Sequence, residues 1–485
     1  MEEKKYPLVF RGSKGMSLIP LVVMIAFAVY FFGFAGVYDT LALALGGLVA
    51  LIIDSFFAKN IISFWDAAIG GMADELGNVL ALILLVVGIF GKMMTRGHIA
   101  EGFVWIGDSL NVSGSTICVF AFIVTAIIAT STGTSIGTIL TMVPILMPVA
   151  AIMGANMNVL IGAIMSGALF GDSIGPVSDV TIASSQTQEF RGGGRPDIGG
   201  VVKARIKYSL IAAALSIVLF FVFGGGGEMT AESKALLTQY SDPKGLLMLI
   251  PMIVLLLVAF KTKSIFLAAT IGIVTGTIVG LVSGIMHPSD ILLVEDGAMS
   301  GFIIDGINNM IGTVLAVYMI VAMIGILKSC GMMDSIVTKL TNSKAGKSPL
   351  GADLMIALGT ALTSLMLGSM NGPSCLMYGP IANEVGKGAG LHPYRRANLL
   401  ACFSSTLPTM NPFSSVFVIL TLGGVSGVVE QYSFIDPVSP MSLPGGMFYC
   451  MMFPLVFFVT MFTGWGREFE GENGEIVKRR TKIAA

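Results

Sequence analysis

Charged side chains are scarce in this sequence. Only 12% of its 485 residues are Asp, Glu, Lys or Arg, while 54% are hydrophobic; soluble domains contain about 25% charged residues. This shortage excludes an ordinary soluble domain. The net charge of −1, with no large basic tract, also excludes a surface built for nucleic acid. The lipid bilayer is therefore the partner that the composition indicates.

Cysteine and histidine are also rare. The five cysteines stand singly in apolar stretches without C-x-x-C spacing, and the three histidines are scattered. Such a pattern favours neither a disulfide framework nor a metal centre. We therefore expect no cofactor beyond a coupling ion, Na⁺ or H⁺, and no enzyme.

Long apolar runs are abundant. Stretches of about 20 residues, enough to cross the hydrocarbon core, recur along the chain, for example at 17–36, 78–94, 208–225 and 445–465. They predict an all-α polytopic membrane protein with about eleven spans and further segments that do not cross completely. The first run is too long for a signal peptide and lacks a clear cleavage site, so it is interpreted as a span.

The chain also resembles itself. Leu18 begins "LIPLVVMIAF" and Leu249 begins "LIPMIVLLLVAF"; similar pairs start at Asn78 and Thr313, and polar breaks coincide at Gly133 and Gly368. The sequence therefore predicts two repeats. The expected divisions are a cytoplasmic N-terminus (1–15), a first repeat (16–207), a linking span and external loop (208–245), a second repeat (246–440), a last span (441–466) and a cytoplasmic tail (467–485).

Positive charge predicts that the repeats are inverted. Basic residues mark cytoplasmic loops. They precede the first span of the first repeat, but "KTK" at 261–263 follows the equivalent span of the second. The same rule places both termini in the cytoplasm and 228–244 outside. We expect a plasma (inner) membrane location.

Each repeat carries two polar breaks within apolar sequence. They are "TSTGTSIGT" (130–138), "GDSIGPVSDVTIASS" (171–185), "LGSMNGPS" (367–374) and "SSTLPTMNPFSS" (404–415). Inverted repeats with interrupted helices are typical of secondary transporters, whose sites lie at the midplane where the repeats meet. The predicted ion- or substrate-binding residues are Thr132, Gly133, Thr134, Ser135, Asp172, Ser173, Ser178, Asp179, Thr181, Ser369, Asn371, Thr409, Asn411 and Ser414.

Two carboxylates stand in the second break. Asp172 and Asp179 are the only acids between Asp108 and Glu189, and an ionisable group at membrane depth is by default functional. A carboxylate binds Na⁺ when ionised and a proton when not, which suits exchange. We rank Asp179 first, with Na⁺ at Thr134, Ser135 and Asp179. The alternatives are that the acids cap helices and that the hydroxyl groups join helices.

Two of these breaks carry a family resemblance. "STGTSIGT" and "FGDSIGPVSDVT" resemble the motifs of the NhaC-type sodium/proton antiporter family, over nearly the full chain by break order. The resemblance implies scaffold and transport domains, re-entrant hairpins, an elevator motion and Na⁺ or H⁺ coupling. Some relatives in this superfamily move amino acids or organic acids.

Several functions remain open at this point. One alternative is an intramembrane hydrolase, but its motif "GTSIG" (133–137) lacks the strand that should precede it. A nucleotide-driven pump is another, but "AGKS" (345–348) lacks the first glycine of a P-loop. A channel is the third. The leading hypothesis is Na⁺/H⁺ antiport; the alternative is Na⁺- or H⁺-coupled transport of a small organic solute such as an amino acid or carboxylate. The G-x-x-x-G steps at 272–284 predict a close helix contact, within the chain or in a homodimer. Segments 64–77 and 294–309 are expected to be matching interfacial helices.

Overall fold

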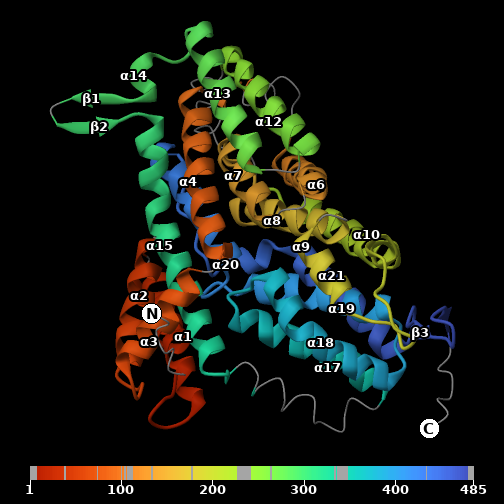
Figure 1. Ribbon diagram of the computed structural model, residues 1–485. Coiled ribbons are helices and arrows are strands. Elements are labelled where there is room, and N and C mark those ends of the chain that lie inside the picture. Colours follow the sequence, from red (N-terminus) through yellow and green to blue (C-terminus); the bar gives the residue numbers. More distant parts are fainter. Residues whose placement is uncertain are drawn as a thin grey trace.

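A computed structural model describes residues 8–35, 37, 40–73, 75–99, 101–102, 105, 113–132, 135–175, 178–226, 242–262, 265–295, 297–332, 335, 348–432 and 434–478. These residues are almost entirely helical (Figure 1). Eight helices among them are long and apolar enough to cross a membrane, and further apolar helices are shorter. The predicted all-α polytopic fold is therefore confirmed.

One group of helices forms what we call the scaffold (Figure 1). It contains η1 (Lys14–Leu18), α1 (Ile19–Ala28), η2 (Val29–Ala35), α2 (Thr40–Ser55), α3 (Ile61–Met72), α4 (Glu75–Arg96), η3 (Pro243–Met248), α12 (Leu249–Thr262), α13 (Ile265–Ser283), α14 (Pro288–Ile291) and α15 (Phe302–Ser329). The central helix is α15, which packs against α2, α3 and α4. Glycines permit the closest approaches: a Cβ at Gly88 would lie 2.6 Å from the carbonyl oxygen of Gly306.

The other group, the site-bearing helices, contains the polar breaks. Its members are α6 (Gly114–Thr132), α7 (Ser135–Ile152), α8 (Met157–Ile174), α9 (Asp179–Gln186), α10 (Ile198–Phe223), α17 (Pro349–Met366), α18 (Asn371–Ala389), α19 (Pro393–Ser405), η5 (Pro408–Met410), α20 (Val416–Gln431), η6 (Leu443–Gly446) and α21 (Phe448–Thr463). The repeat is visible in the helix starts: α6 and α17 begin at positions 114 and 349, and α8 and α19 at 157 and 393.

Helices α6 and α7 form a hairpin that turns at the first break. The start of α6 adjoins the end of α7, because a Cβ at Gly114 would lie 2.4 Å from the carbonyl oxygen of Gly154. Helix α8 then runs parallel to α6, with Gly167 beside Phe122 and Gly171 beside Ala126. Since glycine has no Cβ, the two helices meet almost backbone to backbone.

Helices α17 and α18 repeat this arrangement in the second half. The Tyr378 hydroxyl of α18 donates to the carbonyl of Met355 in α17 at 3.0 Å, so these helices are also paired as a hairpin. Helix α19 lies along α17, because the Ser364 hydroxyl donates to the carbonyl of Ser404 at 2.8 Å and Asp353 pairs with Arg395 at 3.1 Å.

The two hairpins enter from opposite ends of α10. At the end of α10, Asn156 N–H donates to the carbonyl of Gly224 at 2.8 Å, beside the entry of the first hairpin. At its beginning, the Tyr394 hydroxyl of α19 donates to Asp197, beside the entry of the second. This opposition is the geometry of an inverted repeat. The residue boundaries of the divisions listed above stay a prediction.

The glycine steps at 272–284 pack inside the chain. Gly272 lies beside Phe90 and Leu255, and Gly276 beside Met93, so this face of α13 contacts α4 and α12. Residues 294–309, in contrast, are not the expected interfacial helix. They contain the antiparallel strands β1 (Leu293–Glu295) and β2 (Ala298–Ser300) and the start of α15, whereas 61–72 is helical as α3. The turn at Gly297, with φ of 78°, explains the difference.

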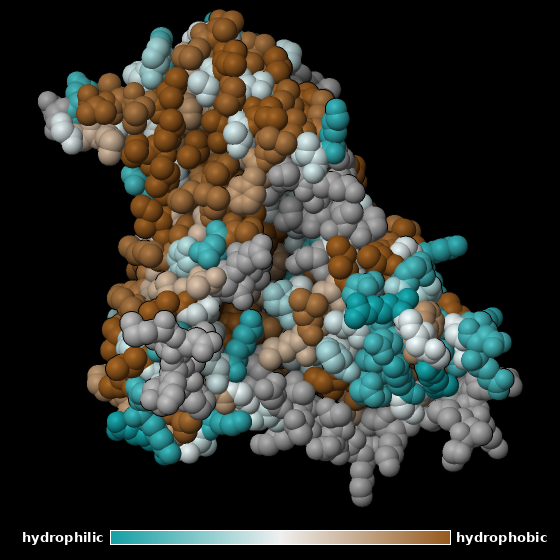
Figure 2. Space-filling model, in the orientation of Figure 1, coloured by the Kyte–Doolittle hydropathy of each residue, from teal (hydrophilic) through white to brown (hydrophobic). Residues whose placement is uncertain are grey.

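Hydrophobic side chains cover much of the outer surface. Figure 2 shows them over α4, α13 and α15, whereas hydrophilic side chains gather around β3. Large apolar residues on this surface are strongly exposed, for example Val282 at 84% and Phe34 at 82%. In a bilayer such side chains contact lipid, as expected for a multi-pass membrane protein.

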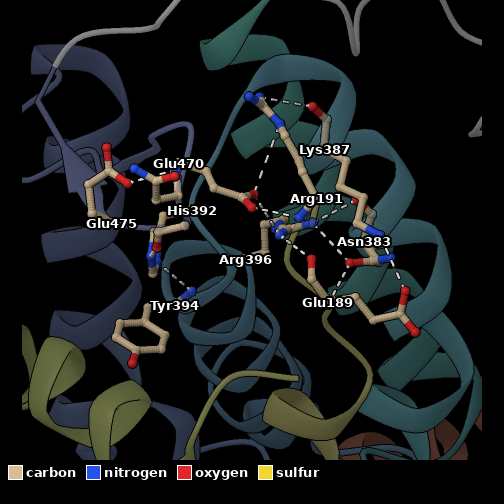
Figure 3. A network of polar contacts seen from close by, with 11 residues as sticks. Glu189, Arg191, Asn383, Lys387, His392, Tyr394, Arg396, Glu470 and Glu475 are labelled. Carbon is tan, nitrogen blue, oxygen red and sulfur yellow. Dashed lines mark hydrogen bonds and ion pairs between the residues drawn. The ribbon is translucent and has the colours of Figure 1, made fainter. Parts of the chain in front are cut away.

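The C-terminal segment packs across the ends of the site-bearing helices. Its strands β3 (Phe469–Glu470) and β4 (Ile476–Val477) pair with each other, and Phe469 bridges to Leu391. Figure 3 shows the contacts that hold it: Glu470 accepts from the backbone N–H of Arg191 at 2.6 Å and lies 3.7 Å from the guanidinium of Arg396. We call this segment (468–477) the tail clamp.

His392 anchors the same clamp in its neutral form. Its Nδ1 accepts from the N–H of Tyr394 at 3.2 Å, and its Nε2 lies 3.2 Å from the carbonyl oxygen of Gly474, to which it can only donate. One ring nitrogen must therefore be unprotonated. Burial lowers the pKa of His392 to about 4, which agrees with that assignment.

Candidate functional site

The four polar breaks lie where helices of the two repeats end and begin. Helices α6, α8, α17 and α19 end there, and α7, α9, α18 and α20 begin there. The C-terminus of a helix presents carbonyl oxygens with partial negative charge, and the N-terminus presents N–H groups with partial positive charge. The breaks therefore offer ligands for a cation and for an anion without further secondary structure.

Asp172 and Ser135 join the first hairpin to α8. The Ser135 hydroxyl donates to Asp172 Oδ2 at 3.0 Å, and both side chains are buried. Asp172 lies 15 residues after the start of α8, which is about 22 Å along the helix. The alternative that Asp172 caps the next helix is wrong: α8 continues to Ile174, and the cap of α9 is Ser178, which accepts from Thr181 N–H at 3.4 Å.

Ser173 extends the polar contacts toward α21. Its hydroxyl donates to the carbonyl of Phe170 at 2.9 Å and lies 3.1 Å from the hydroxyl of Tyr449. Thr181, in α9, is fully buried, and its hydroxyl has no hydrogen-bond partner among the described residues.

The tip of the second hairpin is tied to its own half. Ser369 has φ of 65°, a conformation that a non-glycine residue rarely adopts, and its hydroxyl donates to the carbonyl of Pro408 at 2.7 Å. In the orientation that satisfies its amide, Asn371 donates to the carbonyls of Ser369 at 2.8 Å and Ser404 at 2.9 Å. Strain held by such contacts is typical of functional positions.

The last three predicted residues lie after α19. Asn411 donates to the Ser414 hydroxyl at 2.6 Å and accepts from Phe413 N–H at 3.1 Å. The Thr409 hydroxyl is buried and, within the described part of the chain, has no hydrogen-bond partner. Ser135 and Asp172 are hydrogen-bonded within the first half, and Ser369, Asn371, Asn411 and Ser414 within the second. The first half therefore offers a carboxylate, and the second half neutral groups.

Four predicted residues are described incompletely or not at all. Gly133 and Thr134 lie outside the described residues. Thr132 ends α6 and Asp179 begins α9, but their side chains lie outside the described part of the structure. The ranking of Asp179 over Asp172 therefore stays a prediction.

The predicted site residues do not include Arg205, because in sequence it belongs to the basic segment "RGGGRPDIGGVVKARIK" (191–207), which the positive charges predict to be a cytoplasmic loop. In the structure Arg205 lies in α10 and is fully buried, whereas Lys203 and Lys207 in the same helix are exposed. The helical spacing of Arg205 with Ser209, Ala212 and Ser216, all buried, was the signal that could have found it.

A separate cavity of about 830 Å³ lies between the scaffold and α20. Lys92 and Arg96 line it from α4; Lys92 pairs with Glu430 of α20 at 3.4 Å, and Arg96 pairs with Asp305 of α15 at 3.0 Å. The predicted site residues are not among its lining residues in the described part of the chain.

The profile of the Na⁺/H⁺ antiporter family matches residues 6–191 and 198–414, which include the first three breaks and all but the last residue of the fourth. The chain belongs to this family. It is 25% identical over 368 residues to the malate-2H(+)/Na(+)-lactate antiporter of Bacillus subtilis, covering 71% of this chain and 75% of that one. It is 22% identical over 328 residues to the Na(+)/H(+) antiporter NhaC of Alkalihalophilus pseudofirmus, covering 62% and 68%.

The chain is also similar to the solved structure of MtrF from Neisseria gonorrhoeae, which is described as one of a class of antimetabolite efflux pumps. The TM-score is 0.42 and the sequence identity 12%, and the match covers 87% of this chain and 95% of that one. A likeness at that score carries no argument about function. Family membership makes the chain a transporter and confirms the resemblance drawn from the motifs.

Proposed function

We propose that the protein is a Na⁺/H⁺ antiporter and that Asp172 is part of its exchange site. The observation that carries the proposal is the buried contact between Asp172 and Ser135, where the tip of a hairpin meets the end of a helix. A carboxylate binds Na⁺ in its ionised form and a proton in its neutral form. Na⁺ and H⁺ therefore compete for one group.

Oxygen atoms around this carboxylate complete a shell for a small hard cation. We include the predicted ligands Thr132, Gly133, Thr134 and Asp179 in this proposal, together with the unpartnered Thr181 hydroxyl. Carbonyl groups at the ends of α6 and α8 add to them. Asp179 begins α9 next to the cap residue Ser178, so the two acids belong to the same break.

The proposed cycle is alternating access at this site, in a plasma (inner) membrane with both termini cytoplasmic. The malate-2H(+)/Na(+)-lactate antiporter among the relatives makes an organic acid the alternative cargo, exchanged together with the coupling ions. The opposite entry of the two hairpins supports a site reachable from either face.

Purified protein in proteoliposomes with an internal pH dye tests the proposal. An imposed Na⁺ gradient should drive proton flux in the wild type, and Asp172→Asn should lower it to background because the variant keeps the size but loses the titratable proton. Asp436→Asn, in an exposed loop, is the matched control. Loss with Asp179→Asn alone would move the exchange group to Asp179. Normal flux in both folded variants would refute the proposed site.

A further inference from the structure

Arg205 is a buried cation with an incomplete set of partners. Its side chain is fully buried in α10, and Nε donates to Asn398 Oδ1 of α19 at 3.0 Å. The terminal nitrogens Nη1 and Nη2 have no hydrogen-bond partner among the described residues. Guanidinium groups that are buried ordinarily have every donor satisfied, since an unpaired buried charge is costly.

The position of Arg205 connects it with the exchange site. Helix α10, which carries Arg205, packs against α8, which carries Asp172, and against α21, which carries Tyr449. The Tyr449 hydroxyl, in turn, lies 3.1 Å from the hydroxyl of Ser173, the residue next to Asp172. Arg205 and the proposed ion-binding carboxylate therefore lie on neighbouring helices, and Ser173 and Tyr449 are in contact between α8 and α21.

We infer that Arg205 binds the carboxylate of a small organic acid carried at this site. The inference rests on the proposed function, which it extends from ions to a substrate class. With Nε held by Asn398, the two free terminal nitrogens form the planar fork that matches a carboxylate with two parallel hydrogen bonds.

Charge balance explains why the acid and the ion travel together. In the empty site, the positive charge of Arg205 opposes the binding of a cation at Asp172, because like charges repel. A carboxylate bound to Arg205 neutralises that charge, so that Na⁺ or H⁺ then binds Asp172 more readily. Binding of the acid and of the cation is therefore mutually favourable, and by linkage each ligand raises the affinity for the other by the same factor.

Binding to the wild-type protein is the first test. Thermal unfolding of the purified full chain is followed with sodium L-lactate, sodium L-malate or sodium chloride at equal Na⁺ concentration, and then with the choline salts. We expect lactate or malate to raise the unfolding temperature beyond chloride, and more strongly with Na⁺ than with choline. Equal effects of chloride and both acids would overturn the inference, because the site would then bind any anion or none.

Substitution of Arg205 is the second test. Arg205→Gln should weaken the apparent affinity for the stabilising acid by about 100-fold, since two charged hydrogen bonds are lost, and Arg205→Lys should weaken it less. Lys203→Gln removes a positive charge from an exposed position on the same helix and should leave the affinity unchanged. Unchanged affinity in a folded Arg205→Gln protein would overturn the inference.

Transport in proteoliposomes separates this inference from the proposed function. Labelled lactate or malate uptake should require a Na⁺ or pH gradient and should be lost in Arg205→Gln. If Na⁺-driven proton flux persists without any acid and no acid is transported, the exchange function stands and the role of Arg205 in substrate binding is wrong. If acid uptake persists without any dependence on Na⁺ or pH, the proposed coupling fails instead.

Discussion

Gly171 is the position at which a single added carbon should displace Asp172. A Cβ there would lie 2.2 Å from the carbonyl oxygen of Ala126 and 2.8 Å from the backbone nitrogen of Thr130 in α6. Ordinary contacts begin at 3.4 Å, so α6 and α8 must separate by about 1 Å. The 3.0 Å contact between Ser135 and Asp172 would not survive such a shift without rearrangement.

We therefore expect Gly171→Ala to lower Na⁺-driven proton flux by about 100-fold, the effect that a displacement of about 1 Å has on reacting groups. Overpacking should also lower the free energy of unfolding by about 1–3 kcal/mol. Gly70→Ala is the control, because nothing lies within 4 Å of its added Cβ in α3. Equal flux in the two variants, measured at equal protein per liposome, would refute the claim that close packing of α6 and α8 positions the carboxylate.

Three further predictions concern stability and orientation. Asp353→Asn leaves Arg395 buried without its counter-charge, so the free energy of unfolding should fall by about 3–5 kcal/mol; a thermal midpoint equal to wild type would contradict this. Because burial lowers the pKa of His392 to about 4, only the unfolded chain gains a proton between about pH 6.5 and that value. The free energy of unfolding should thus fall by about 3 kcal/mol as the pH drops through this window. If the free energy of unfolding of His392→Asn depends on pH as steeply as that of the wild type, the tail clamp is not the source of the pH dependence. The basic segment 191–207 is predicted to be cytoplasmic, and segment 416–445, which has no Lys or Arg, external. The five native cysteines are buried, so an impermeant maleimide added to intact cells should label Asp436→Cys but not Arg195→Cys; the reverse pattern would invert the topology.

The fold was predictable from sequence where apolar length and polar interruption decide it. Apolar runs, the repeat offset and the Gly- and Ser-rich breaks follow from the absence of water in the bilayer core, which forces every lipid-facing backbone group into a helix. The strand pair at 293–300 was not predictable in this way, because a turn at one glycine outweighs a weak amphipathic pattern.

The site was predictable in part for a different reason. A hydroxyl-rich break and an isolated acid identify Ser135 and Asp172, but their 3.0 Å contact depends on the parallel packing of α6 and α8, which sequence spacing does not determine. Arg205 resembles a loop charge in sequence. Only the packing of α19 and α21 against α10 makes it a buried cation.

The two chain ends are attached to different parts of the molecule. Near the N-terminus, Arg11 N–H donates to the carbonyl of Phe57 at 2.8 Å, just beyond α2, whereas the tail clamp joins His392 N–H to the carbonyl of Glu468 at 3.0 Å. A fluorophore at one end would therefore report the position of the scaffold, and one at the other end that of the site-bearing helices. Energy transfer between the two ends of a single chain should reveal whether one part slides or tilts against the other during transport, without any label near the ions.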